Sequence, residues 1–172
     1  LHIGRIANFT YPPGNMNITE ILCTDTGPGN TMMDAFIQQH FKGKHFDKDS
    51  VIALKGNINN ELLFALKDNA FFKQALPKTT GPELFNLDYL QQAKEKSLTT
   101  MLSVEDTMAT LNKFSADTII DALLKTISKD VSIKIYASGG GMHNPLLMQH
   151  IKAALPNCEF LTTADLDIEP DA

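Results

Sequence analysis

The sequence predicts an α/β fold, and the order of its elements is the first reason. Two strand-like segments are followed by several helical segments and then by strand, helix and strand, an order typical of α/β proteins. The second reason is that two strand-like segments run directly into a glycine-rich turn and a helix start, at residues 25–30 and 139–145. With 172 residues, 43% of them hydrophobic, the chain is long enough to form one domain with a buried core.

The first 41 residues predict a β-hairpin followed by a helix. We expect a strand over Leu1–Tyr11, a turn at Pro12–Asn15 and a second strand over Ile18–Thr24. The helix is expected over Thr31–Phe41, and its first four residues, Thr-Met-Met-Asp, match a capping box.

The rest of the chain predicts further helices and two strands. From Ser103 to about Ser128, apolar residues recur at three- and four-residue steps, which is typical of an amphipathic helix on a core. Ser103 is expected to cap this helix, with Asp106 at its third position. The other expected elements are helices over Ile58–Leu66, Leu87–Lys96 and Pro145–Leu155 and strands over Val131–Ala137 and Glu159–Thr162.

Asp25 is the first candidate for chemistry. It follows the second expected strand and opens the run Asp-Thr-Gly-Pro-Gly-Asn. A carboxylate at the tip of a strand can orient a metal-bound phosphate or take a proton from an attacking hydroxyl. Gly27 and Gly29 let the backbone approach a ligand closely. The same residue types also form ordinary turns and helix caps, so the run alone allows a purely structural interpretation.

The three glycines Gly139–Gly141 are the second candidate. They lie between an expected strand and a helix that begins with Asn144 as its cap and Pro145 at its first position. Such a junction exposes backbone N–H groups and the positive end of a helix, which suits a nucleotide. The spacing matches neither the dinucleotide-binding motif nor the P-loop. A tight turn is the structural alternative, although three consecutive glycines cost more chain entropy than a turn requires.

Two weaker signals lie elsewhere in the chain. Gly4, within an expected strand, indicates either a close backbone approach or a bulge, and Arg5 either pairs with phosphate or is a solvated surface residue. Lys78 and Thr80 offer a cation and a hydroxyl to a polar substrate, or Thr80 and Glu83 form a capping box with no chemistry.

Composition narrows the class of protein. The net charge of −5 argues against a nucleic-acid partner, and the sequence contains no apolar run long enough to span a membrane. Cys23 and Cys158 have no metal-ligand spacing, and Cys23 is expected to be an inert thiol in a buried strand. This cysteine usage fits a reducing cytoplasm. The chain opens in a strand pattern and stops without a closing element, so we expect a piece of a longer polypeptide.

Segments along the whole chain carry a resemblance to a known family. They are residues 1–8, 25–30 with 34–35, 46–49, 77–81 with 83–86, 109–111, 139–141 with 144–147, and 168–172. Taken in this order, they resemble the C-terminal half of the anhydro-N-acetylmuramic acid kinases, members of the actin/Hsp70/sugar-kinase ATPase superfamily. Each segment is modest by itself, and the specificity comes from their order and spacing.

The resemblance implies a ribonuclease-H-like lobe with a mixed sheet flanked by helices. Residues 1–172 would be the C-terminal lobe of a two-lobe sugar kinase, truncated at both ends. Such kinases use ATP and Mg²⁺ to open 1,6-anhydro-N-acetylmuramic acid with water and to phosphorylate it to N-acetylmuramic acid 6-phosphate in cell-wall recycling. The resemblance assigns the catalytic aspartate to Asp25, as general base on the attacking water. The nucleotide-binding residues that we expect are Gly4, Arg5, Asn8, Gly27, Gly139, Gly140, Gly141 and Asn144. The substrate-binding residues that we expect are Gly29, Asn30, Lys78 and Thr80, and no residue is expected to ligate a metal directly.

Three positions depart from the family pattern. Arg5 stands where the family usually has glycine, Pro82 where arginine is common, and His2 where asparagine is usual. These departures keep open a non-catalytic nucleotide-binding or interaction protein on the same fold. A third hypothesis is an unrelated α/β nucleotide or dinucleotide enzyme that uses only the triple-glycine turn. We expect the missing N-terminal lobe to be a partner, the fragment alone to be inactive, and a homodimer to be a further assembly to consider.

Overall fold

The computed structural model describes residues 1–15, 17–127 and 132–166. Its first part is an antiparallel sheet in the order β1–β2–β3, formed by His2–Ile3, Ile6–Tyr11 and Leu22–Pro28. The single strand expected over Leu1–Tyr11 is therefore wrong, because the chain reverses at Gly4 and Arg5 and pairs Ile3 with Ala7. The predicted β-hairpin is confirmed for β2 and β3.

The second expected strand lies further along the chain than predicted. Ile18–Glu20 forms a short 3-10 helix (η1), and β3 extends to Pro28, so Asp25 lies within the strand and not at its tip. Asp25 is paired with Asn8 of β2 next to a bulge. Cys23 is exposed, which corrects the expectation of a buried thiol.

Helices make up most of the remaining chain. They are α1 (Thr31–His40), α2 (Asn60–Lys67), α3 (Ala70–Lys73), α4 (Leu87–Lys96), α5 (Val104–Thr126) and α6 (Pro145–Ala154). Short 3-10 helices are η2 (Lys48–Ser50), η3 (Ala53–Lys55), η4 (Gly140–His143) and η5 (Thr163–Leu166). The expected helices are thus confirmed within a few residues at their ends.

The capping predictions have mixed outcomes. Ser103 caps α5 and accepts a hydrogen bond from the N–H of Asp106 at 3.0 Å, as predicted. Ser128, the expected end of that helix, lies outside the described residues, and α5 ends at Thr126. The capping box expected at the start of α1 is wrong, because Asn30 occupies the cap position and makes no side-chain cap bond. Thr80 begins no helix either, so its capping-box alternative is also wrong.

The C-terminal strands form a parallel pair beside β1. β4 (Ile133–Ala137) pairs with β5 (Cys158–Thr162), while Val131 lies outside the described residues. The N–H of Ile3 donates to the carbonyl of Ser138 at 2.8 Å, and the N–H of Ser138 donates to the carbonyl of Leu1 at 2.9 Å. These bonds place the end of β4 next to β1, so antiparallel and parallel strands lie in the order β3–β2–β1–β4–β5. The predicted α/β class is confirmed.

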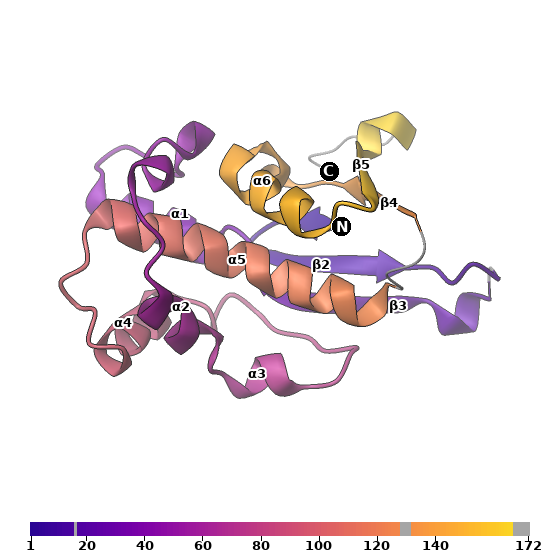
Figure 1. Cartoon of the computed structure of the whole chain (residues 1–172), viewed down its shortest axis with the longest axis horizontal. Coiled ribbons are helices and arrows are strands. Elements are labelled where there is room, and N and C mark those ends of the chain that lie inside the picture. Colours follow the sequence, from indigo (N-terminus) through magenta and orange to yellow (C-terminus); the bar gives the residue numbers. More distant parts are fainter. Residues whose placement is uncertain (16, 128–131, 167–172) are drawn as a thin grey trace.

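The central element is α5, which runs along the β2–β3 hairpin (Figure 1). In this view α6 and the β4–β5 pair lie on one side of α5, and α2, α3 and α4 lie on the other. Burial of the apolar side chains of α5 is its main stabilising contribution. The large side chains of α5 that are fully buried are Met108, Leu111, Phe114 and Ile119. An aromatic cluster surrounds Phe114 and contains Phe71, Phe72, Phe85 and Tyr89.

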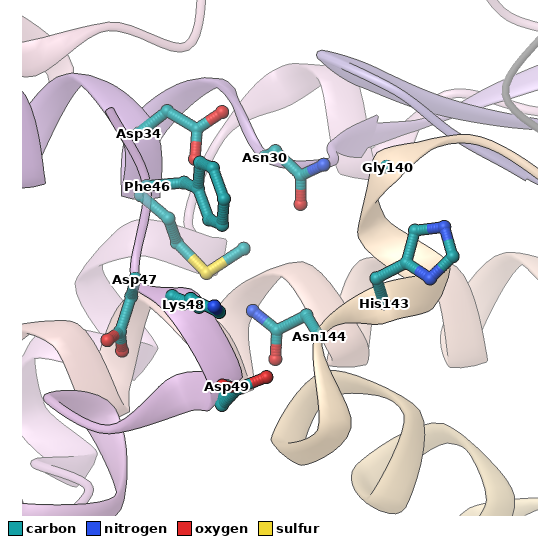
Figure 2. Close-up of a pocket in the computed structure, with 10 residues that line it drawn as sticks. Asn30, Asp34, Phe46, Asp47, Lys48, Asp49, Gly140, His143 and Asn144 are labelled. Carbon is teal, nitrogen blue, oxygen red and sulfur yellow. The ribbon is translucent and has the colours of Figure 1, made fainter. Parts of the chain in front are cut away.

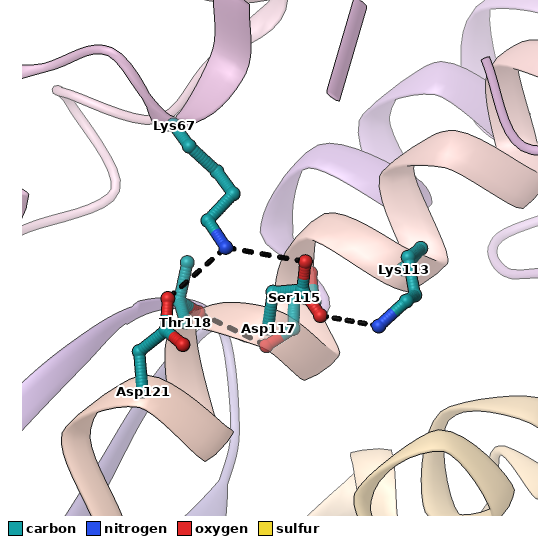
Figure 3. A network of polar contacts seen from close by, with 6 residues as sticks. All are labelled: Lys67, Lys113, Ser115, Asp117, Thr118 and Asp121. Atoms are coloured by element: carbon teal, nitrogen blue, oxygen red, sulfur yellow. Dashed lines mark hydrogen bonds and ion pairs between the residues drawn. The ribbon is translucent and has the colours of Figure 1, made fainter. Parts of the chain in front are cut away.

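Polar contacts link α5 to its neighbours (Figure 3). Lys67 of α2 lies 3.3 Å from Asp117 and 3.0 Å from Asp121, and these partly exposed ion pairs contribute little to stability. On another side of the helix, Ser115 donates to the carbonyl of Gly29 at 2.9 Å in a buried position. This bond ties the chain just beyond β3 to α5. No helix in the described part of the chain is long and apolar enough to cross a membrane.

Candidate functional site

The turn between β1 and β2 holds the start of α1 through backbone hydrogen bonds. The carbonyl of Gly4 accepts the N–H of Asn30 at 2.9 Å, and the carbonyl of Arg5 accepts the N–H groups of Gly29 at 2.9 Å and Thr31 at 3.2 Å. A Cβ atom on Gly29 would lie 2.2 Å from the oxygen of Gly4, so only glycine allows this approach. The two glycine motifs near the start of the sequence are therefore one structural unit.

The triple-glycine turn packs against β1. Gly139 has a φ of +84°, and a Cβ atom there would lie 2.8 Å from the carbonyl oxygen of Ile3. A Cβ atom on Gly141 would lie 2.2 Å from the Ile3 side chain. Gly140 is different, because the nearest atom to its would-be Cβ is the amide nitrogen of Asn30 at 3.8 Å. Gly139 and Gly141 serve close packing, while Gly140 is exposed and has no close neighbour.

His2 joins the two glycine turns, a role that the sequence analysis missed. Its ring lies within 3 Å of the positions that Cβ atoms on Gly4 and Gly139 would take, and its Nδ1 lies 3.1 Å from the hydroxyl of Ser138. The departure from the family pattern at position 2 therefore fills a defined space between the turns.

A pocket of about 480 Å³ opens where these turns meet α1 and α6 (Figure 2). Its volume lies in the range that small-molecule ligands occupy. Its lining residues are Asn30, Met33, Asp34, Phe46, Asp47, Lys48, Asp49, Gly140, His143 and Asn144. Of these, Asn30, Gly140 and Asn144 are site residues predicted from the sequence. Residues 46–49 form one of the segments that carry the family resemblance, and the sequence predicts no role for them.

The wall formed by residues 46–50 is held in an unusual backbone conformation. Both carboxylate oxygens of the buried Asp47 accept backbone N–H groups, from Ile52 and Ala53 at 2.9 Å each. Asp49 and Ser50 both have a φ of 55°, in the left-handed region that residues other than glycine rarely adopt. Because no hydrophobic period signals such a turn, sequence reasoning had no means of finding it.

Asp34 gives the pocket its main electrostatic feature. Burial raises the pKa of its carboxyl to about 6, and the positive charge of Arg5 partly opposes this rise. Arg5 is exposed on the β1–β2 turn, so its guanidinium is available both to Asp34 and to a ligand. The pocket therefore contains a carboxyl group whose pKa lies above its ordinary value.

The carboxylate of Asp25 is held by the loop at residues 78–80. Its Oδ2 accepts the N–H of Thr80 at 2.8 Å and the hydroxyl of Thr79 at 3.0 Å, and its own N–H donates to the carbonyl of Lys78 at 2.9 Å. Within the described part of the chain, Oδ1 of Asp25 has no hydrogen-bond partner. One oxygen is thus fixed while the other is left to act on a ligand.

Lys78 directs its charge to aromatic side chains. Its Nζ donates to the carbonyl of Phe71 at 3.0 Å and lies 4.1 Å from the centre of the Phe71 ring. Burial, followed by the charge of Lys125, lowers the pKa of the Lys78 amine. In this structure the side chain of Lys78 anchors the loop that holds Asp25.

The expected site residues fall into two groups along β3. Asp25, Asn8, Lys78 and Thr80 form the first, and Asn30, Gly140 and Asn144 line the pocket. Gly4, Arg5 and Gly29 form the turn between them, and Gly27 packs on Thr118 of α5. The structure therefore places Asn30, expected beside the substrate, with residues expected to bind the nucleotide. At about 3.3 Å per residue, the three residues from Asp25 to Pro28 span about 10 Å.

The described residues offer no ready-made metal cage. No group of three or more His, Cys, Asp or Glu side chains that could hold a metal ion occurs in the ranges 1–15, 17–127 and 132–166. Mg²⁺ in phosphoryl-transfer sites is commonly held by one or two carboxylates, water and the phosphates of the substrate. With phosphates and water as the main ligands, that mode of binding requires no cage of protein side chains.

The structure is an α/β domain with a pocket at its glycine turns. The family model described as anhydro-N-acetylmuramic acid kinase matches residues 1–172. Relatives named anhydro-N-acetylmuramic acid kinase include those of Pseudoalteromonas atlantica (48% identical over 173 residues), Pseudoalteromonas translucida (46% over 173) and Photobacterium profundum (40% over 176). The chain belongs to the anhydro-N-acetylmuramic acid kinase family, which confirms the resemblance. The matches cover 99–100% of this chain and only 43–45% of these relatives.

Proposed function

We propose that this protein is an ATP-dependent kinase that opens 1,6-anhydro-N-acetylmuramic acid with water and phosphorylates it. The observation that carries this proposal is the carboxylate of Asp25, with Oδ2 held by Thr79 and Thr80 and Oδ1 free of partners among the described residues. A carboxylate held in this way is positioned to take a proton from water. Family membership supports the same reaction.

The chain would be the C-terminal lobe of a two-lobe enzyme with a ribonuclease-H-like sheet. The strand order β3–β2–β1–β4–β5, with β1 to β3 antiparallel and β4 to β5 parallel, supports this fold. The length of the relatives, of which the chain covers 43–45%, supports a second lobe. Two free cysteines, Cys23 and Cys158, support a reducing cytoplasm as its location. A homodimer stays a prediction.

ATP would bind with its adenosine in the pocket and its phosphates toward Asp25. Asn30, Gly140 and Asn144 line the pocket with amides and open backbone, which suits the polar edges of a nucleoside. The phosphates would then pass the Gly4–Arg5 turn on their way to Asn8, with the exposed guanidinium of Arg5 as a cation for their oxygens. Gly27, Gly139 and Gly141 would contribute by close packing.

The anhydro sugar would lie beside Asp25 and the loop at Lys78–Thr80. Gly29 already uses both its N–H and its carbonyl within the chain, so it would support this region without contacting the sugar through those groups. Mg²⁺, when bound, neutralises phosphate charge and would be held mainly by the phosphates and by water, which leaves the free oxygen of Asp25 to act as the base.

The proposed reaction uses Asp25 once, as general base. Water attacks the anomeric carbon and gives a proton to Asp25, while the bond from that carbon to O6 breaks. The released O6 attacks the γ-phosphorus of ATP, and ADP leaves, giving N-acetylmuramic acid 6-phosphate. Positioning and electrostatic stabilisation supply most of the catalysis in such transfers.

Turnover of ATP with 1,6-anhydro-N-acetylmuramic acid by the intact protein tests this proposal. We expect product from the wild type and a loss of about 10²- to 10⁴-fold in Asp25→Asn, which retains the shape of the side chain but not its basicity. Asp88→Asn, an exposed change in the first turn of α4, is the matched control. Full activity in Asp25→Asn would remove Asp25 from catalysis. ATP binding without turnover in the wild type would instead support a non-catalytic nucleotide-binding protein.

A further inference from the structure

The side-chain oxygen of Asn144 is surrounded by donors from three separate elements. It accepts the N–H of Leu147 at 2.9 Å, the hydroxyl of Ser50 at 2.7 Å and the Nδ2 group of Asn112 at 3.0 Å. Ser50 in turn accepts the N–H of Leu146 at 3.2 Å, which fixes its hydroxyl. The start of α6, the wall at residues 46–50 and the middle of α5 therefore meet at one amide oxygen.

This arrangement decides which way the Asn144 amide points. A backbone N–H can only donate, so the atom that faces Leu147 must be the oxygen. The nitrogen then points into the pocket, as Figure 2 shows. Across residues 1–15, 17–127 and 132–166, the Nδ2 atom of Asn144 has no hydrogen-bond partner. Asn144 thus presents two N–H donors to whatever occupies the pocket.

The two residues that hold this amide have energetically unfavourable features of their own. Asn112 is fully buried, and its own Oδ1 has no partner in the described part of the chain. Ser50 is also fully buried and adopts a φ of 55°, a strained conformation for a residue with a side chain. Unpaired buried polar atoms and strained backbones both occur preferentially at functional sites.

We propose that Ser50 and Asn112 are positioning residues that lock the amide of Asn144 with its N–H groups toward the pocket, where they donate to an acceptor atom of adenosine. This inference rests on the proposed binding of ATP in the pocket. It adds a requirement to that function: the nucleoside must offer a ring nitrogen or ribose oxygen at this point, and a donor group there is rejected.

Nucleotide titrations of the intact protein test the inference. Asn144→Asp keeps an oxygen for Leu147, Ser50 and Asn112 but replaces the N–H donors with a second oxygen, so we expect ATP affinity to fall about tenfold or more. Ser50→Ala removes one of the three donors and lets the amide turn, for an expected loss of about 3- to 10-fold. Asn112→Ala is expected to act in the same direction, with thermal unfolding recorded alongside because the site is buried.

A panel of ATP analogues separates positioning from a general structural effect. The analogues each lack one acceptor: 1-deaza-, 3-deaza-, 7-deaza-, 2′-deoxy- and 3′-deoxy-ATP. The wild type should bind one of them more weakly than ATP, and Asn144→Asp and Ser50→Ala should lose that discrimination. The matched control is Asn59→Asp, since Asn59 caps α2 with the same oxygen-to-N–H bond and does not line the pocket.

The outcomes distinguish the positioning role of Ser50 and Asn112 from the proposed binding of ATP. Unchanged ATP affinity in Asn144→Asp and Ser50→Ala, or equal weakening of ATP and every analogue, would overturn the positioning role while the proposed function stands. A wild-type protein that binds no ATP would refute the proposed function and this inference with it.

Discussion

Replacing Asp34 with asparagine should stabilise the protein at neutral pH and leave its stability near pH 4 unchanged. Asp34 is half-buried in the pocket, where burial raises the pKa of its carboxyl from 3.8 to about 6 even though Arg5 pulls it the other way. Ionisation of this carboxyl is therefore less favourable in the folded protein than in the unfolded chain. Asparagine has a similar shape and no charge to bury.

The sign and size of the effect follow from this pKa. Between 3.8 and about 6 the folded protein binds more protons at Asp34 than the unfolded chain does, so stability falls as pH rises through that interval. The full difference between the folded and unfolded pKa values of Asp34 corresponds to about 3 kcal/mol in the free energy of unfolding. Because Asp34 keeps contact with solvent, we expect the measured change in that free energy to be about 1 kcal/mol. For a domain of this size, about 1 kcal/mol shifts Tm by about 2–4 °C.

Thermal unfolding of the wild type and Asp34→Asn from about pH 4 to about pH 8 measures the effect. The two curves of Tm against pH should coincide near pH 4 and separate above pH 6, with the variant higher. Arg5→Gln is the companion variant. Loss of the Arg5 charge should lower the Tm at pH 8 in the wild-type protein and should have no such effect in the Asp34→Asn variant. A lower Tm for Asp34→Asn at pH 8, or the same gain at both ends of the range, would refute the reasoning.

Two further variants test the packing and capping that position the site. Gly29→Ala should destabilise the protein by about 1–3 kcal/mol, because its Cβ would lie 2.2 Å from the oxygen of Gly4; Gly14→Ala, with no atom within 4 Å, is its control in the same unfolding assay. Ser103→Ala should cost about 1 kcal/mol through the lost cap bond to Asp106, measured by urea unfolding, and an unchanged midpoint would show that the cap contributes nothing.

Local chemistry explains why some elements could be predicted from the sequence. The start of α5 at Ser103 and the start of α6 at Asn144 and Pro145 follow from cap residues whose bonds reach only three positions along the chain. The glycine turn before α6 could be predicted in the same way. The different roles of its three glycines could not, because the packing of Gly139 on β1 depends on residues far away in sequence.

Features that depend on distant contacts could not be predicted from the sequence. The reversal at Gly4 and Arg5 was missed because the apolar alternation of residues 1–11 is the same for one strand as for two. Lys78 carries a charge suited to a substrate, yet its amine contacts Phe71. The partners of Asn144 lie 94 and 32 positions away, at Ser50 and Asn112, beyond any local pattern.

The most direct test of the central claim is the fate of oxygen when the intact protein turns over in H₂¹⁸O with ATP and 1,6-anhydro-N-acetylmuramic acid. If Asp25 activates water at the anomeric carbon, ¹⁸O must appear on that carbon in the phosphorylated sugar faster than unlabelled product exchanges its anomeric oxygen in the same H₂¹⁸O, with one ADP formed per ring opened. Asp25→Asn should lose ring opening and phosphoryl transfer together. Phosphorylated sugar without ¹⁸O at the anomeric carbon, or ring opening that survives in Asp25→Asn, would contradict the account.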